Sequence, residues 1–504
     1  MSLYSYGMDY MKQRGRLTSI SIILMLFTAL PLFAQDTGPV RSNDSNTKLA
    51  FTNVTIIDVE EGVAKPDMSV IVTGDRITAV GTTDEIEVPD EATIIDGTGK
   101  YLIPGLWDMH AHIVSDDWVL PLLRVNGITG LRSMHGGARI HDVIDKRKDG
   151  SYLGFNFHYS GPIVDGPPGL WDGSLIAATP EEGREVVRDL YAAGYDFVKV
   201  YSNLSRETYF AIAEESRKLG YTFAGHVPWS VTTAEAMASG QKSIEHMIGL
   251  EHLVKNPDEL QQLIRDNDTI IVNSTGQIDL FKWFEYVLEH HEPTRIPVLL
   301  ESVGSSDAWF CPTLVNLRAS SYSNDPGFIN DERLKYIPEE ERSIWQAPME
   351  SEEFPEEFIK QNERQYELSS QYYHKVSSLL NPMLNSGANF LAGTDIGNPY
   401  LYPGFSVHDE MELFVEAGFT PQEALRTATL NPARYLNVID SLGTVENGKL
   451  ADLVLLDANP LEDITNTQKI HAVVANGRYF DRQVLDELLK EAEAAAKKSK
   501  TNDE

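Results

Sequence analysis

Cysteine is almost absent from this chain of 504 residues, which contains a single one, Cys311. One cysteine cannot form an intramolecular disulfide, and it cannot build a cysteine-rich zinc site. Cys311 stands in the apolar run Trp309-Phe310-Cys311-Pro312, and free cysteines are commonly buried. We therefore expect Cys311 to be a core residue, and we expect no metal site made of a cysteine cluster.

Basic residues are also scarce, because 42 Lys and Arg stand against 75 Asp and Glu, for a formal net charge of −33. Such a surface repels phosphate backbones and anionic lipid headgroups, so nucleic acid is not an expected partner. The same charge also serves solubility. Hydrophobic residues make up 42% of the chain, which supplies enough apolar material for a sizeable core.

The apolar stretch near the start, residues 20–33, is about 14 residues long and thus short for a helix that spans a bilayer. Basic residues precede it at Lys12, Arg14 and Arg16. This pattern is typical of a secretory signal peptide, expected over residues 1–35 with cleavage near Ala34. We therefore expect a periplasmic or secreted protein without stable membrane insertion after cleavage. An uncleaved anchor remains the alternative, and the start residue, Met1 or Met11, stays open.

Short runs with strand-like alternation occur near both ends of the chain. They cover residues 51–57, 69–72, 76–80, 451–456 and 470–477. The pattern predicts a small β-sandwich domain assembled from both ends, with its parts at 48–104 and 437–482.

Between these parts, strand-like runs alternate with helical patterns. The run 197–201 is followed by a helical segment, 206–219, which stops at Gly220, and the next run begins at Tyr221. Repeated units of this kind predict an α/β fold, a (β/α)8 TIM-like barrel over residues 105–436. Periodicity alone does not distinguish a closed barrel from an open sheet.

Two further segments stand apart from this alternation. Residues 316–362 are rich in Glu, Ser, Asn, Asp and Pro and are expected to be an insertion in the barrel. Such insertions often cover the mouth of a site, and a surface elaboration without function is the alternative. Residues 483–504 are expected to form a charged helical tail.

Histidines alternate in the segment that ends the first predicted barrel strand, at His110 and His112. Residues i and i+2 of a strand share a face, so both imidazoles could approach one metal ion. Further candidates stand at or just beyond other predicted strand ends: Lys199, His226, His246 and Asp395. In a parallel barrel these ends form the active-site face, so the sequence predicts one site from all six residues.

The segments that carry these residues read P-G-L-W-D-M-H-A-H, F-V-K-V-Y, A-G-H-V-P, S-I-E-H-M and A-G-T-D, in this order. In these motifs the chain resembles the amidohydrolase superfamily, in particular the imidazolonepropionase-related branch that includes binuclear Xaa-Pro dipeptidases. The resemblance covers about residues 48–482. It implies that His110, His112 and Asp395 bind a first divalent ion and that His226 and His246 bind a second, with zinc as the expected metal.

The resemblance also implies that Lys199 bridges both ions after carbamylation. An ammonium cannot ligate a cation, whereas a lysine carbamate is anionic and offers two oxygens. The alternative is an unmodified Lys199 beside a single ion or in a salt bridge. The implied reaction uses a hydroxide that bridges the ions, with Asp395 passing a proton to the leaving nitrogen.

Residues that contact the substrate are harder to predict. The segments 165–169 and 226–229 depart from the pattern of dipeptidase-like members. His135, Tyr201 and Arg318 lie near the expected mouth, and an arginine is well suited to a substrate carboxylate. For each of the three, a packing or surface role is the alternative.

The leading hypothesis is an exported metal-dependent amidohydrolase that cleaves an amide C–N bond of a small molecule, such as a dipeptide or an N-acyl amino acid. A mononuclear deaminase or cyclic-amidine hydrolase, like imidazolonepropionase, is the second hypothesis, and Lys199 disfavours it. A non-catalytic binding protein on the same fold is the third. The sequence leaves open whether the chain forms a homo-oligomer.

Overall fold

A computed structural model describes residues 47–113, 116–136, 154–247, 253–273, 277–345 and 356–498. The expected signal peptide lies outside these ranges. Within them, no helix combines the length and the hydropathy that a bilayer-spanning segment requires.

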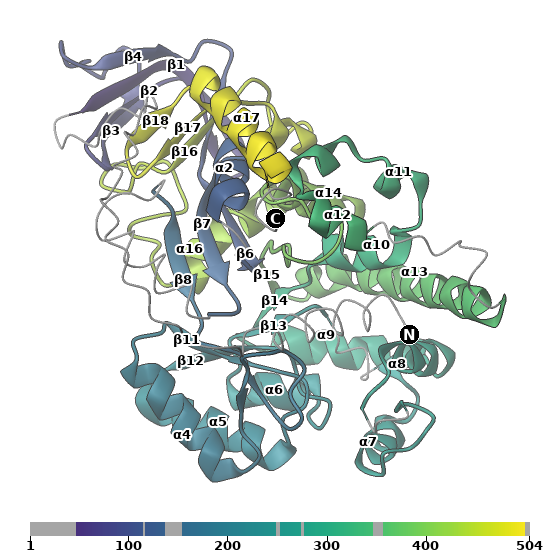
Figure 1. Ribbon diagram of the computed structural model, residues 1–504. Helices are drawn as coiled ribbons and strands as arrows, with labels where there is room; N and C mark the ends of the chain where they lie inside the picture. Colours follow the sequence, from purple (N-terminus) through teal and green to yellow (C-terminus); the bar gives the residue numbers. More distant parts are fainter. Residues whose placement is uncertain are drawn as a thin grey trace, which may run out of the picture.

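An eight-stranded sheet joins both ends of the chain (Figure 1). Its order is β18-β17-β16-β5-β1-β2-β3, with β4 against β1. The strands are β1 (Lys48–Asp58), β2 (Val63–Thr73), β3 (Arg76–Thr82), β4 (Thr93–Asp96), β5 (Tyr101–Pro104), β16 (Leu453–Leu456), β17 (Ile470–Ala475) and β18 (Arg478–Phe480). Alternate residues of β1 and β16, such as Leu49, Phe51, Leu453 and Leu455, form one apolar cluster. The prediction of a β domain built from both ends is confirmed, while its boundaries stay predictions.

A ring of eight parallel strands occupies the centre of the described chain. These strands are β6 (Leu106–Ala111), β7 (Ile128–Ser133), β8 (Asn156–Tyr159), β11 (Phe197–Val200), β12 (Thr222–Gly225), β13 (Ser243–Glu245), β14 (Trp309–Cys311) and β15 (Asn389–Phe390). Parallel bridges Ser160–Phe197 and Ala111–Ile396 join β8 to β11 and close the ring from β15 to β6. The fold is therefore the predicted closed barrel, and Cys311 is buried within it.

Two short strands and a set of helices surround the ring. The strands are β9 (Val164–Asp165) and β10 (Leu175–Ile176), and the helices between barrel strands include α2 (Asp116–Val125), α4 (Pro180–Ala192), α5 (Arg206–Leu219), α6 (Thr233–Ser239), α7 (Pro257–Arg265), α8 (Leu280–Glu289), η2 (Pro293–Arg295) and α9 (Ile296–Gly304). Helix α5 has the predicted bounds because Ser205 caps its first turn and Gly220 ends it at φ 61°.

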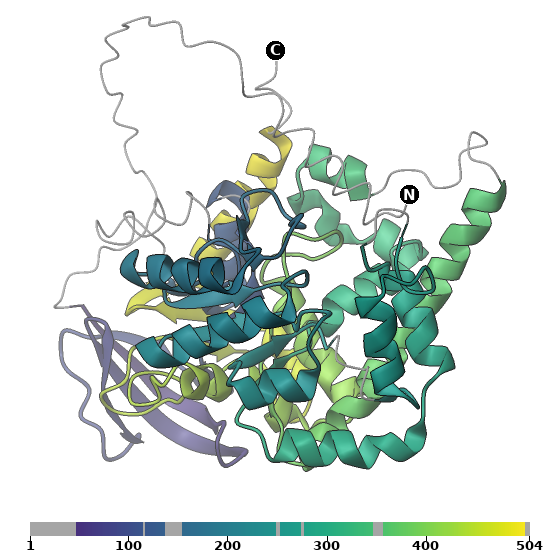
Figure 2. The same cartoon turned by 90° about the horizontal axis from the view of Figure 1, so that it is seen from below.

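A long helical excursion separates β14 from β15, where the sequence predicts an insertion. It contains α10 (Leu314–Tyr322), α11 (Pro326–Ile329), η3 (Glu332–Tyr336), α12 (Glu339–Trp345) and α13 (Glu356–Asn385). After β15 come α14 (Phe405–Glu416), α15 (Pro421–Thr427), α16 (Leu430–Tyr435), η4 (Ile464–Gln468) and α17 (Arg482–Lys498). Helix α17 packs against α2, and α13 lies on the side away from the β domain (Figures 1 and 2).

Candidate metal centre

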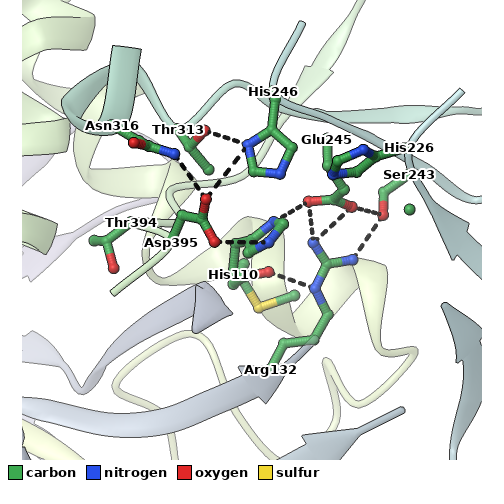
Figure 3. Close-up of polar contacts among 12 residues, drawn as sticks. His110, Arg132, His226, Ser243, Glu245, His246, Thr313, Asn316, Thr394 and Asp395 are labelled. Carbon is green, nitrogen blue, oxygen red and sulfur yellow. Dashed lines mark hydrogen bonds and ion pairs between the residues drawn. The ribbon is translucent and has the colours of Figure 1, made fainter. Parts of the chain in front are cut away.

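The barrel gathers the six predicted metal-site residues at the carboxyl ends of its strands. His110 and His112 end β6, and Asp395 follows β15. The Nε2 atom of His110 lies 3.3 Å from Oδ1 of Asp395 (Figure 3), and that of His112 lies 3.0 Å from the same oxygen. Two imidazoles thus face one carboxylate oxygen, which is the arrangement that a shared metal ion requires.

The remaining three residues lie on the next part of the ring. His226 follows β12 and His246 follows β13, with their ring centroids 4.8 Å apart. The ring of His246 is also 4.5 Å from that of His110. Lys199 lies on β11, and its charge lowers the pKa of His226 and His246. All six predicted residues therefore lie around one centre.

Burial sets the protonation of this centre. It lowers the pKa of His112, brings that of His246 to about 3, and lowers that of His226 well below its ordinary value. These imidazoles are neutral near pH 7, so each has a nitrogen lone pair for a ligand. Burial opposes ionisation of Asp395, but the adjacent His110 and His246 hold its pKa well below the usual range.

Two buried nitrogens indicate that these residues would fit a cation. Lys199 Nζ has no hydrogen-bond partner among the described residues, and Lys199 is only 1% exposed. His110 Nε2 is also buried, and its 3.3 Å contact with Asp395 Oδ1 does not have the geometry of a hydrogen bond. An unsatisfied buried polar atom costs about 1–3 kcal/mol, so such atoms usually have a function. Burial lowers the pKa of Lys199 to about 8, against the opposing charges of Glu245 and Asp395. A neutral amine, the form that reacts with carbon dioxide, is thus accessible.

A buried ion pair beneath the centre was not predicted from the sequence. Glu245 Oε2 lies 2.8 Å from His110 Nδ1, and Arg132 Nη2 donates to both oxygens of Glu245 at 2.9 and 3.0 Å (Figure 3). Burial opposes ionisation of Glu245, but Arg132 and His110 hold its pKa below the usual range. Because Glu245 accepts the Nδ1 proton, His110 keeps Nε2 free for the centre. One feature of the sequence could have indicated Glu245, because this acidic residue directly precedes His246 at the end of a strand-like run.

The loop that carries Asp395 is fixed to β6 by a second buried carboxylate. Asp108 accepts hydrogen bonds from the hydroxyl and the backbone N–H of Thr394. Burial raises the pKa of Asp108 to about 6. The loop lies so close to β6 that a Cβ at Gly393 would stand 2.7 Å from both Cβ and the backbone nitrogen of His110. Asp395 itself has φ 62°, a strained backbone conformation that is frequent at functional sites.

Two of the three predicted substrate-contact residues lie beside the centre. His135 ends β7, with its ring centroid 6.4 Å from that of His112, and burial lowers its pKa to about 4. Tyr201 stacks on His226 at 3.9 Å, and its hydroxyl accepts a hydrogen bond from Trp171. Arg318 lies on α10, where its charge affects the pKa of Tyr373 and Glu412. No pattern in the sequence predicts the contact between Trp171 and Tyr201.

Comparisons with known proteins agree with this geometry. Residues 336–479 match the amidohydrolase family. The chain is 25% identical over 458 residues to an imidazolonepropionase from Geobacillus sp. (strain WCH70), a match that covers 81% of this chain and 89% of that protein.

Solved structures give the same fold. Bottromycin amidohydrolase superposes with a TM-score of 0.70 and 24% identity, over 89% of this chain and 90% of that one. A provisionally named prolidase from Bifidobacterium longum has a TM-score of 0.62 and 25% identity, over 89% of this chain and all of that one. Together with the family match of residues 336–479 and the likeness to imidazolonepropionase, these structures support the amidohydrolase superfamily for this chain and indicate a hydrolase of carbon–nitrogen bonds.

Proposed function

We propose that this protein is an exported, metal-dependent amidohydrolase that cleaves the amide bond of a small molecule, with a dipeptide or an N-acyl amino acid as the substrate class. The observation that carries the proposal is the buried Lys199 amine, which has no hydrogen-bond partner among the described residues and lies within a group of neutral histidines. The composition of this group favours two divalent ions over one. Export is inferred from residues 1–35 alone.

His110, His112 and Asp395 would hold one ion, and His226 and His246 the other, with Lys199 shared between them as its carbamate. Bound divalent ions, zinc first among them, supply a polarised carbonyl and a water of lowered pKa. Asp395 is placed to accept the proton of the attacking water and to donate it to the leaving nitrogen, a poor leaving group until protonated. Its lowered pKa keeps it ionised near pH 7.

His135 and Tyr201 are the proposed substrate contacts. His135 is neutral at pH 7, so it offers both an N–H and a lone pair beside His112. Tyr201 forms, with Trp171, an aromatic surface next to His226. The proposal for Arg318 has less support, since the interactions described for it involve Tyr373 and Glu412.

The test is reconstitution of the purified, metal-free protein with Zn²⁺ and bicarbonate, followed by assay against a library of dipeptides and N-acyl amino acids. Two ions per chain and hydrolysis of a library member support the proposal. A fully loaded protein that hydrolyses none of them contradicts it. One ion per chain with ammonia release from an amidine or aminopurine would favour the mononuclear deaminase instead.

A pair of lysine variants tests the bridge. Lys199→Met should bind about one ion per chain with or without bicarbonate, because it lacks the amine. Lys242→Met, a control at a half-buried lysine elsewhere in the barrel, should load like the wild type. Bicarbonate-independent loading of the wild type would count against the carbamate.

Asp395→Asn should lose activity, and an active Asp395→Asn preparation would show that the activity belongs to another site.

A further inference from the structure

The first turn of α10 reaches two of the proposed site residues. Thr313, just before this helix, lies with Oγ1 2.8 Å from Nδ1 of His246, and Asn316 donates from Nδ2 to Oδ2 of Asp395 at 2.7 Å (Figure 3). Thr313 and Asn316 are 0% and 7% exposed. Both contacts are therefore shielded from water, where a hydrogen bond orients its partners most firmly.

The turn is held in place by the carboxyl group of a glutamate from another helix. Thr313 occupies the N-cap position of α10, but its side chain makes no capping hydrogen bond, because it is directed to His246. Glu410 on α14 supplies the missing acceptors, with Oε1 and Oε2 3.0 and 2.7 Å from the backbone nitrogens of Leu314 and Val315. Burial raises the pKa of Glu410 to about 8, although the two backbone N–H groups at the helix N-terminus oppose this rise, so its oxygens act here as hydrogen-bond acceptors. Glu410 is fully buried, so this contact fixes α10 against α14.

We propose that Thr313, Asn316 and Glu410 form a positioning element that sets the orientation of Asp395 and the tautomer of His246. The proposal rests on the function assigned to Asp395 above. Asn316 holds Oδ2 of Asp395, so Oδ1 is the oxygen that faces His110 and His112. When Nδ1 of His246 donates to Thr313, Nε2 keeps the lone pair that a ligand needs. Glu410 contacts neither residue and acts through the backbone of the turn.

This assignment gives the excursion between β14 and β15 a role in the site. Its first helix, α10, starts immediately after β14 and supplies Asn316, while its packing on α14 is fixed through Glu410. The excursion is thus attached to Asp395 by a chain of buried hydrogen bonds. A change in how α10 packs would alter the direction of the Asp395 carboxylate.

Cobalt binding tests the positioning without any substrate. Metal-free protein is titrated with Co²⁺, and the visible absorption, which reports ligand geometry, is recorded. Thr313→Val removes the hydroxyl but keeps the β-branched shape at φ 48°, and Thr313→Ser keeps the hydroxyl. We expect Thr313→Val to weaken Co²⁺ binding about 10–100-fold and to change the spectrum, while Thr313→Ser stays within about threefold of the wild type. Equal behaviour of the two variants would overturn the role of Thr313.

A kinetic comparison tests Asn316 and Glu410. Asn316→Leu should lower kcat about 10–100-fold with little change in KM, and Glu410→Gln should act in the same direction but less strongly. The controls are Asn431→Leu, at a half-buried asparagine that donates to Phe390 O, and Glu416→Gln, at an exposed glutamate of α14. Melting temperatures of all four variants identify any general loss of stability. Unchanged kcat in Asn316→Leu, or an equal loss in Asn431→Leu, would overturn the proposal.

The two proposals fail in distinguishable ways. If the loaded wild type hydrolyses no member of the library but Thr313→Val alone disturbs Co²⁺ binding, the proposed function is wrong and the positioning element stands. If the wild type is active and the variants match it in both Co²⁺ spectrum and kcat, the positioning element is wrong and the function stands.

Discussion

The two sides of the metal centre are held by different chemistry, although the rings of His110 and His246 are only 4.5 Å apart. On the His110 side the partner is the carboxylate of Glu245, itself paired with Arg132 inside the barrel. On the other side the partners are neutral hydroxyls, Thr313 for His246 and Ser202, 2.8 Å from Nδ1, for His226. A carboxylate partner raises the basicity of a ligand histidine, and a hydroxyl does so much less.

The difference indicates that one side is fixed by charge within the barrel core and the other by neutral contacts from the segments that follow β11 and β14. A buried ion pair is costly to break, because the remaining charge has no partner. A buried hydroxyl contact contributes about 1 kcal/mol. The His110 side should therefore be the more rigid side and the tighter metal site. Four predictions test this contrast, from the largest expected effect to the smallest.

Removal of Arg132 should produce the largest loss. Arg132→Met leaves the buried Glu245 without its cationic partner, so we expect the free energy of unfolding of the metal-free protein to fall by about 3–5 kcal/mol. The measurement is urea unfolding. The double variant Arg132→Met/Glu245→Leu should recover part of the loss. Arg364→Met, at an exposed ion pair with Glu285, should cost less than about 1 kcal/mol. A loss at Arg132 as small as at Arg364 would remove the distinction between the two sides.

The support outside the barrel should be sensitive to acid through His408 of α14, whose ring contacts Thr467 and the carbonyl of Asn126. Burial lowers its pKa to about 4 from the ordinary 6.5. As pH falls from 6.5 to 4 the unfolded chain gains a proton that the folded one does not, so stability is lost, by about 3 kcal/mol in total.

The variant His408→Gln should remove this part of the loss. Unfolding by urea at several pH values should show a shallower decline in the variant than in the wild type, and His471→Gln, at an exposed histidine, should leave the decline unchanged. Parallel wild-type and His408→Gln curves would mean that His408 titrates in the folded protein as it does in the unfolded chain.

Competition with a chelator should remove the two ions in separate steps, with the ion on the His226 and His246 side lost first. Glu245→Gln should weaken the tighter step about 10–100-fold and bring the two steps together. The ions released per chain at each chelator concentration give the result. A single step in the wild type, or two steps unaffected by Glu245→Gln, would show that the hydroxyl and carboxylate partners hold their ions equally.

Loss of the Tyr201 hydroxyl should have the smallest effect. Tyr201→Phe keeps the ring on His226 and removes the acceptor for Trp171 Nε1, 2.6 Å away. We expect a cost of about 1 kcal/mol or less and a change in KM of a few-fold, with kcat little altered. A large fall in kcat with an unchanged KM would mean that the hydroxyl takes part in the reaction.

Local patterns predicted much of the fold and the six central residues. Strand alternation and the Gly220 stop were sufficient for the strands and for α5, and the six side chains were predictable because each stands at a strand end. Their partners were not, since Glu245 and His110 are 135 positions apart and Glu410 and Leu314 are 96 apart. Only the closed barrel brings such residues together.

Arg318 shows that the direction in which a helical side chain points is also hard to predict from the sequence. It stands on the same helix as Asn316, two positions later, yet Asn316 contacts Asp395 while the charge of Arg318 affects Tyr373 and Glu412. Residues i and i+2 of a helix do not share a face. The chemistry of an arginine fits a substrate carboxylate, but the start of α10, which sets the direction of each side chain, cannot be read from composition.

The pairing of β5 with β16 has a consequence for the synthesis of the chain on the ribosome. Pro104 is opposite Leu453, so one edge of β5 finds its partner only after about 350 further residues are made. At ordinary synthesis rates of about 5–20 residues per second, this interval is roughly 20–70 s. An open strand edge is a template for aggregation during that time. This edge of β5 therefore stays without its partner on the nascent chain until the last strands are made.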